Sequence, residues 1–133
     1  MHEWALAESI VSYILEKANE VNIKKISEVE IKIGELRQID IEILSIALKT
    51  LSENTILEKA NFKISIEEAF LKCRACGYEW SYKEAKKKIE EKDIEAIHFI
   101  PEIIHSFIRC PKCNSIDFEI IKGKDVWIEK IKS

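Results

Sequence analysis

Hydrophobic and polar positions in the first half of the chain follow two different periods. Over residues 4–19 apolar side chains recur at helical spacing, which predicts an amphipathic helix with one broad buried face. Residues 28–33 alternate strictly between polar and apolar side chains, as a half-buried strand does, and Gly34 ends that alternation. Asp40 can cap a second helix over residues 41–52, where helical spacing returns. The pattern therefore predicts the order helix, strand, helix.

Two further segments with strand character extend this order. Residues 61–68 alternate again and complete a strand–helix–strand unit, which predicts a right-handed crossover. Over residues 117–131 a break at 122–124 indicates a hairpin or two short strands, and we expect the last strand to return to the first sheet. The expected fold class is therefore α+β, with a small mixed three-stranded sheet and two helices.

The composition changes between these segments. Residues 72–114 contain all four cysteines, both prolines and a highly charged stretch, so we interpret them as an inserted module that resembles a four-cysteine zinc ribbon. Within it, residues 81–92 should form an exposed helix, because few of their side chains could be buried. The chain would then comprise an α/β domain, residues 1–71 with 115–133, and a cysteine module, residues 72–114.

Composition and charge narrow the classes of function. The chain has 133 residues and a net charge of −3, so it lacks the basic excess with which proteins bind nucleic acid. No apolar stretch reaches the roughly 18 residues that span a bilayer, and the start lacks the pattern of a signal peptide. We therefore expect a cytoplasmic protein that contacts neither nucleic acid nor membrane. In the cytoplasm, two close cysteine pairs indicate a metal more often than disulfides.

The strongest chemical motif is a pair of Cys-x-x-Cys turns, Cys73–Cys76 and Cys110–Cys113. Two intervening residues let both thiolates of a tight turn reach one ion, and Gly77 and Asn114 can adopt the positive φ that such a turn requires. Four thiolates close a tetrahedral site and leave no open position. Structural Zn(II) is therefore the expected occupant.

Iron is an alternative occupant of the same four thiolates. Both turns also resemble the knuckles of rubredoxin, and iron and zinc bind four thiolates in similar geometry. A rubredoxin-like electron carrier therefore stays open as an alternative function, as does a zinc-ribbon interaction module.

The start of the chain offers a second, different set of ligands. The amine of Met1, the imidazole and backbone nitrogen of His2, and the backbone nitrogen of Glu3 can surround one ion in a plane. Four planar nitrogens suit Ni(II) or Cu(II), whereas Zn(II) prefers a tetrahedron. The only other histidines are His98, which could add a ligand, and His105, for which we expect an ordinary half-buried ring.

Motifs for catalysis are missing from the sequence. It has no glycine-rich phosphate loop, and its serines have no visible partners for nucleophilic catalysis. Most carboxylates are interpreted as solvated surface groups. Nothing in the sequence indicates an enzyme.

Taken together, these motifs resemble the HypA/HybF family of hydrogenase maturation factors, which are nickel metallochaperones. The resemblance covers almost the whole chain and rests on the opening Met1–Ala7, the strand end Ile33–Leu36 and the two cysteine pairs. The stretch His98–Glu102, within a long insertion, is similar to the archaeal form of the family.

The resemblance implies two metals and two partners. Met1, His2 and Glu3 would bind Ni(II) as a transient cargo, with His98 as a further candidate ligand. Nickel would pass to the large subunit of [NiFe]-hydrogenase with the help of a HypB-type nucleotide hydrolase, either a GTPase or an ATPase. Both a monomer and a dimer are compatible with the sequence. The residues implied to bind structural Zn(II) are Cys73, Cys76, Cys110 and Cys113.

Overall fold

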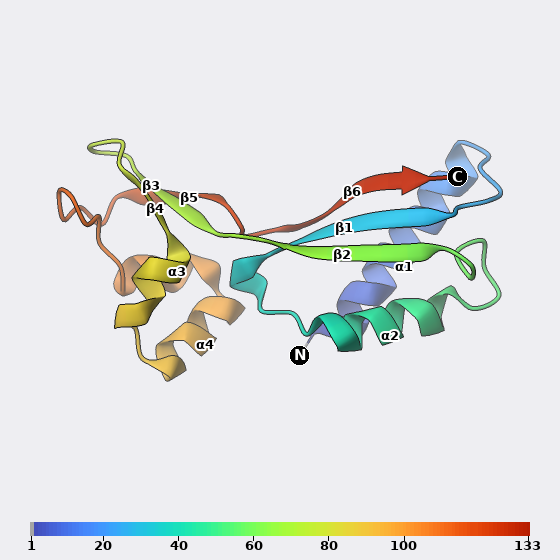
Figure 1. Cartoon of the computed structure of the whole chain (residues 1–133), viewed down its shortest axis with the longest axis horizontal. Coiled ribbons are helices and arrows are strands. Elements are labelled where there is room, and N and C mark those ends of the chain that lie inside the picture. The colour runs from blue at the N-terminus through green and yellow to red at the C-terminus, as the bar shows by residue number, and fades with distance from the viewer. Residues whose placement is uncertain (1) are drawn as a thin grey trace. The chain divides into compact units, whose positions relative to one another are not determined.

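The computed structural model describes residues 2–133 and divides the chain into two compact units (Figure 1). The first, which we call the N-terminal unit, comprises Met1–Lys32, Ile39–Ser65 and Trp127–Ser133. The second, which we call the cysteine unit, comprises Ile33–Gln38 and Ile66–Val126. The cysteine unit therefore also takes in residues on either side of 72–114.

Two helices form the helical layer of the N-terminal unit. Helix α1 spans Glu3–Glu20 and α2 spans Ile41–Ser52, so both predicted helices are confirmed. The carboxylate of Asp40 accepts a hydrogen bond from the Ile43 N–H at 3.1 Å and caps α2, as expected. No helix formed by residues 2–133 is long and apolar enough to cross a bilayer. The buried face of α1 consists of Glu3, Ala7, Ile10, Val11, Ile14 and Ala18.

The helices cover one face of a three-stranded sheet of order β2-β1-β6 (Figure 1). Strand β1 spans Glu28–Gly34, β2 spans Asn61–Glu67 and β6 spans Val126–Lys132. Helix α2 connects β1 to β2, which run in the same direction, and β6 runs in the opposite direction (Figure 1). The mixed three-stranded sheet and the return of the last strand to it are confirmed.

A second three-stranded sheet, of order β4-β3-β5, lies in the cysteine unit. Its central strand β3, Phe70–Cys73, pairs antiparallel with β4, Glu79–Ser81, and with β5, Phe118–Lys122. Strands β5 and β6 therefore belong to different sheets. Of the two expectations for residues 117–131, two short strands are correct and a hairpin is wrong.

The single exposed helix expected over residues 81–92 is also wrong. Helix α3 covers only Tyr82–Ala85 and is followed by a 3₁₀ turn at Lys86–Lys88. Backbone at Ile89 is extended, and a second helix, α4, runs over Glu91–Phe99. The break lets α4 bury Ile97, so the segment contributes to a core instead of standing in solvent. Further 3₁₀ turns lie at Glu35–Arg37 and Pro101–Ser106.

Three backbone segments of the cysteine unit cross closely at two glycines. A Cβ on Gly34 would lie 2.4 Å from the carbonyl carbon of Gly123, and a Cβ on Gly123 would lie 2.3 Å from the Cα of Ala69. Gly123 also has a φ of +89°, which L side chains rarely adopt. The carboxylate of Glu35 accepts the Ala69 N–H at 2.9 Å and fixes the same crossing. The sequence Gly34-Glu35 is thus required by the fold of this unit.

Candidate metal centre

The two cysteine turns have the same local construction. In the first turn the N–H of Gly77 donates to the carbonyl of Cys73 at 2.9 Å, and in the second the N–H of Asn114 donates to the carbonyl of Cys110 at 2.9 Å. The expected positive φ is present at both positions, 77° at Gly77 and 64° at Asn114. Each turn therefore presents its two thiols on the same side of the backbone.

The structure brings all four sulfur atoms together. Their Sγ atoms lie within 4.8 Å of one another. The Cys73–Cys113 pair is 3.5 Å apart and the Cys76–Cys110 pair is 3.7 Å apart. A tetrahedral zinc site with Zn–S bonds of about 2.3 Å places its sulfurs roughly 3.8 Å from one another. The four cysteines therefore fit a tetrahedral metal site of the kind expected.

The four cysteines differ in exposure and in the direction in which their surroundings shift the thiol pKa. Cys73 and Cys110 are 1% and 2% exposed, whereas Cys76 and Cys113 lie at the surface. The backbone N–H of Cys76 holds the pKa of the Cys73 thiol below its usual range. A lowered pKa favours the thiolate, which is the form that binds metal ions. The backbone of the first turn thus favours the metal-binding thiolate form of Cys73 even without a bound ion.

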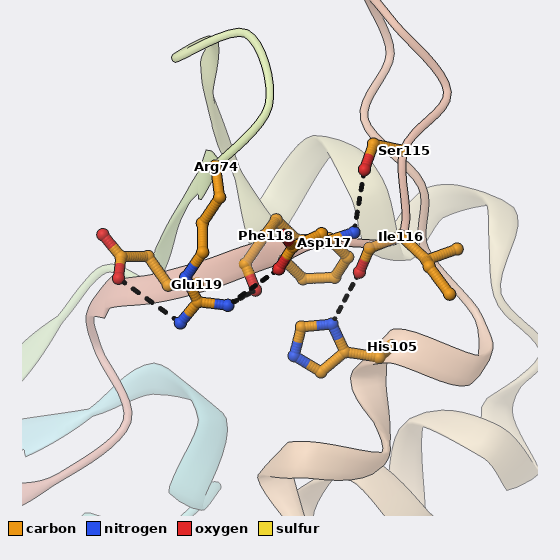
Figure 2. Close-up of polar contacts among 7 residues, drawn as sticks. All are labelled: Arg74, His105, Ser115, Ile116, Asp117, Phe118 and Glu119. Atoms are coloured by element: carbon orange, nitrogen blue, oxygen red, sulfur yellow. Dashed lines mark hydrogen bonds and ion pairs between the residues drawn. The ribbon is translucent and has the colours of Figure 1, made fainter.

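His105 lies beside the second turn and contacts the backbone. Its Nδ1 is 3.0 Å from the carbonyl oxygen of Ile116, and because a carbonyl only accepts, Nδ1 carries the donated proton (Figure 2). The ring lies against Phe118 with ring centroids 4.2 Å apart. His105 is therefore the half-buried structural ring that the sequence predicted.

The residues at the start of the chain lie in the N-terminal unit. His2 is exposed and directly precedes α1, and its carbonyl accepts the first helical hydrogen bond, from the Leu6 N–H at 2.9 Å. Glu3 is only 4% exposed, and its Oε2 accepts the backbone N–H of Asp40 at 2.9 Å. Met1 lies outside the described residues. The sequence analysis did not predict that the Glu3 carboxylate binds the cap of α2, because no local pattern pairs these positions.

His98 lies on α4 in the cysteine unit. Its side chain is 10% exposed, and its Nδ1 is 4.0 Å from Oε2 of Glu95 without forming a hydrogen bond to any described residue. Burial lowers the pKa of the His98 imidazole, so the neutral ring that can bind a metal is favoured. Neither unit by itself contains both His98 and His2.

Comparison with known proteins gives a match over the full chain. Residues 1–133 match a family described as "Hydrogenase/urease nickel incorporation, metallochaperone, hypA". A protein of Pyrococcus horikoshii named Hydrogenase maturation factor HypA is 47% identical over 132 residues, which cover 99% of this chain and 95% of that protein. A protein of the same name from Ignicoccus hospitalis is 34% identical over 131 residues, which cover 97% of this chain and 94% of that protein.

The fold is also found among solved structures. The solution structure of the Ni metallochaperone HypA from Helicobacter pylori matches with a TM-score of 0.64 and 21% identity, covering 99% of this chain and 97% of that one. At that identity the similarity concerns the fold alone. It agrees with the expected combination of helices, a small mixed sheet and a module with four clustered cysteines, to which the structure adds a second three-stranded sheet.

Proposed function

Because this chain belongs to the HypA family of hydrogenase and urease nickel-incorporation metallochaperones, with archaeal relatives, we propose that it carries Ni(II) as a transient cargo for [NiFe]-hydrogenase. Members of this family are maturation factors and not enzymes, as the sequence indicated. The observation that carries the proposal is the position of His2 directly ahead of α1. There an imidazole adjoins backbone nitrogens that precede the first helical hydrogen bond.

The start of a helix suits a metal that binds backbone nitrogen. The first four N–H groups of an α-helix have no acceptor within the helix, so Ni(II) can bind the nitrogens of His2 and Glu3 without breaking the hydrogen bonds of α1. The first of those bonds is made by Leu6, beyond both nitrogens. The His2 imidazole and the Met1 amine would complete a planar set of four. Glu3 would contribute through its backbone, because its carboxylate is bonded to Asp40.

This ligand set determines the charge of the nickel complex and the pH dependence of nickel binding. Two deprotonated backbone nitrogens offset the charge of Ni(II), so the positive end of α1 faces a neutral complex. Each bound nitrogen must lose or lack a proton, and nickel loading should therefore weaken as pH falls. An exposed planar site can also pass its ion to a competing ligand.

His98 is the proposed additional nickel ligand. Burial lowers the pKa of its imidazole, which favours the neutral ring, and its Nδ1 forms no hydrogen bond to another described residue. A buried ring nitrogen without a partner carries a free-energy penalty that a ligand relieves. If His98→Ala leaves nickel affinity and the nickel absorption spectrum unchanged, His98 is not a ligand.

Zinc is proposed as the resident ion of the cysteine unit. Cys73, Cys76, Cys110 and Cys113 would hold it in a closed site, where it serves structure and performs no chemistry. Delivery of nickel would occur in the cytoplasm with a HypB-type GTPase or ATPase, to the apo large subunit of the hydrogenase. The test for this pair of partners is nickel transfer from the loaded protein to each purified partner.

The decisive experiment is a nickel titration of three proteins. They are the protein that starts at Met1, its His2→Ala variant, and a variant extended by Gly-Ser ahead of Met1. We expect both altered proteins to lose nickel binding while their zinc content stays that of the unaltered protein, since only the first ligand set changes. Isothermal titration gives the nickel affinity, and elemental analysis gives the zinc content.

His105→Ala provides the matched control, because it removes an imidazole that the proposal does not use. It should bind nickel as the unaltered protein does. Tight nickel binding by the extended variant would disprove the role of the Met1 amine. Elemental analysis also separates zinc from iron: a red protein with iron at the cysteines would instead support the rubredoxin-like alternative.

A further inference from the structure

A single side chain from inside the first cysteine turn reaches the strand that follows the second turn (Figure 2). The backbone N–H of Arg74 donates to the carbonyl of Asp117 at 2.9 Å. Its guanidinium donates to Asp117 Oδ1 at 3.0 Å and lies 3.5 Å from Glu119 Oε2. We call Arg74, Asp117 and Glu119 the arginine clasp. It joins the first cysteine turn to the segment that directly follows the second turn, which is far away in the sequence.

The acceptor side of the arginine clasp is held in place by its own contacts. The N–H of Asp117 donates to Ser115 Oγ at 3.0 Å, and His105 donates to the carbonyl of Ile116 at 3.0 Å (Figure 2). Phe118 is fully buried and packs edge-on against Trp80. Arg74 therefore binds a segment whose position is already fixed, so the clasp can restrain the first turn.

Among the described residues, the other arginine of the metal-binding region makes no hydrogen bond or ion pair to the first turn. Arg109 donates from Nη1 to the carbonyl of Asn114 at 3.4 Å, a long, exposed hydrogen bond. Among the described arginines, Arg74 alone bonds from one cysteine turn to the segment that follows the other. The chain thus offers a matched pair of arginines, of which one makes such a bond and one does not.

Charge gives Arg74 a second role at the same place. Four thiolates around a divalent ion leave a net charge of about −2, which Asp117 and Glu119 would repel if they stood alone. The guanidinium lies between these two carboxylates and forms an ion pair with each of them (Figure 2). Removing the guanidinium would therefore remove the bonds that hold the first turn to the segment after the second turn. It would also leave the carboxylates of Asp117 and Glu119 close to the negatively charged metal site.

We propose that Arg74 is a positioning residue that holds the two cysteine turns at ligand distance and thereby sets the rate at which the bound metal leaves. The inference rests on the four-cysteine metal site of the proposed function. When one thiolate detaches, its return competes with loss of the ion. A tethered turn keeps that thiolate at high effective concentration, so it rebinds before the ion escapes.

The test measures zinc release from the loaded full-length protein into an excess of a chromogenic chelator. Outer contacts of metal ligands commonly change metal binding by about 10- to 100-fold, and we expect Arg74→Ala to accelerate release by that factor. Arg74→Lys keeps the charge but not the planar fork, so its release rate should fall between the two. Arg109→Ala, the matched control, should release zinc at the unaltered rate.

Two further readouts separate positioning from simple loss of structure. The charge-transfer spectrum of the cobalt-substituted protein should be the same for the unaltered protein and Arg74→Ala, because the four ligands do not change. Raising the salt concentration to 1 M shortens the screening length to about 3 Å and should accelerate release from the unaltered protein but not from Arg74→Ala.

Equal release rates for Arg74→Ala and the unaltered protein would overturn the clasp, as would equal acceleration by Arg109→Ala. If Arg74→Ala does not fold, the double variant Asp117→Asn with Glu119→Gln tests the same contacts by neutralising the two acceptors of Arg74. It should also accelerate zinc release. If the unaltered protein binds no metal at its cysteines, the metal site of the proposed function is wrong. That result can be distinguished from a failure of the clasp, in which the protein binds zinc but Arg74→Ala does not change its release.

Discussion

The two units place their proposed metal ligands on very different scaffolds. In the N-terminal unit the ligands follow one another at the start of the chain, ahead of a helix of 18 residues whose buried face is continuous. In the cysteine unit the proposed ligands come from two separate turns, and the strands of its sheet are only 3 to 5 residues long. The first scaffold is one long helix, whereas the second consists of turns and short strands.

This difference suits two different tasks of a bound ion. A cargo must leave without unfolding the protein, which favours ligand nitrogens that precede Leu6, the first hydrogen-bond donor of α1, as at His2. A resident ion should stay, and burial of two of its four ligands together with the arginine clasp favours that outcome. We therefore expect the stability of the cysteine unit to depend on its metal, and that of the N-terminal unit to be independent of nickel.

Of the changes considered, removing zinc should lower stability most, and only the stability of the cysteine unit should change. Zinc binding contributes on the order of 10–16 kcal/mol in small four-ligand modules, which exceeds the stability that short strands can supply. We expect a chelator with a reductant to unfold the cysteine unit and leave the N-terminal unit folded. Tryptophan fluorescence measures this, because Trp80 lies in the cysteine unit and Trp4 and Trp127 lie in the N-terminal unit.

Single-reporter variants make that measurement specific. Trp4→Phe with Trp127→Phe leaves only Trp80 to report, whereas Trp80→Phe reports on the other unit. The first should show an unfolding transition on zinc removal and the second should show none. A native Trp80 signal in zinc-free protein would mean that the hydrophobic core around it suffices, and the contrast between the units would fail.

Removing the Glu3 side chain should have a smaller effect on stability, and this effect should fall on the N-terminal unit. Glu3→Ala removes a nearly buried carboxylate and leaves the Asp40 N–H without its acceptor in a part-buried contact, at a cost of about 1–3 kcal/mol. Nickel affinity should change little, because the proposed ligand is the backbone nitrogen, which alanine retains. Chemical unfolding measures the free energy, and titration calorimetry measures the nickel affinity.

Glu3→Gln is the conservative partner of that variant. Its amide oxygen can still accept the Asp40 N–H, so most of the stability should return. A loss of nickel binding in Glu3→Ala as complete as in His2→Ala would show that the carboxylate is a ligand, and the backbone model of the nickel site would be wrong.

The sequence predicted what depends on nearby residues. The alternation over residues 28–33, the cap at Asp40 and the turn residues Gly77 and Asn114 each act within a few positions, and the structure confirms all of them. Residues 81–92 were mispredicted because a charged helical pattern conceals the 3₁₀ turn at Lys86–Lys88 and the extended residue Ile89 that follows it. After this break α4 buries Ile97 in a core that includes residues far away in the sequence.

Contacts between distant positions were not predictable for the same reason. Arg74 and Asp117 are 43 residues apart, and Glu3 and Asp40 are 37 apart, so no periodicity or local motif joins them. The four cysteines were paired correctly only because their spacing has a chemical meaning by itself. Charged side chains with a distant partner are indistinguishable in sequence from solvated ones.

Tyr82 gives the smallest expected effect and tests how well the cysteine unit is packed. Burial raises the pKa of Tyr82 to about 12, and its hydroxyl has no hydrogen-bond partner among the described residues. Because the folded pKa lies above the unfolded value of 10.0, this group contributes stability below pH 10, and that contribution is lost as pH rises through about 12. Ionisation of Tyr82 should therefore promote alkaline unfolding of the zinc-loaded cysteine unit.

Tyr82→Phe removes both the ionisable group and an unpaired buried oxygen. We expect the zinc-loaded variant to unfold at a higher alkaline pH, and to gain about 1 kcal/mol near neutral pH, since a buried hydroxyl without a partner is costly. Tyr78→Phe, at an exposed tyrosine of the same unit, is the control and should change neither quantity. A loss of stability in Tyr82→Phe would mean that the hydroxyl forms a hydrogen bond to a partner such as a buried water. Polar contacts would then stabilise the cysteine unit in addition to its metal.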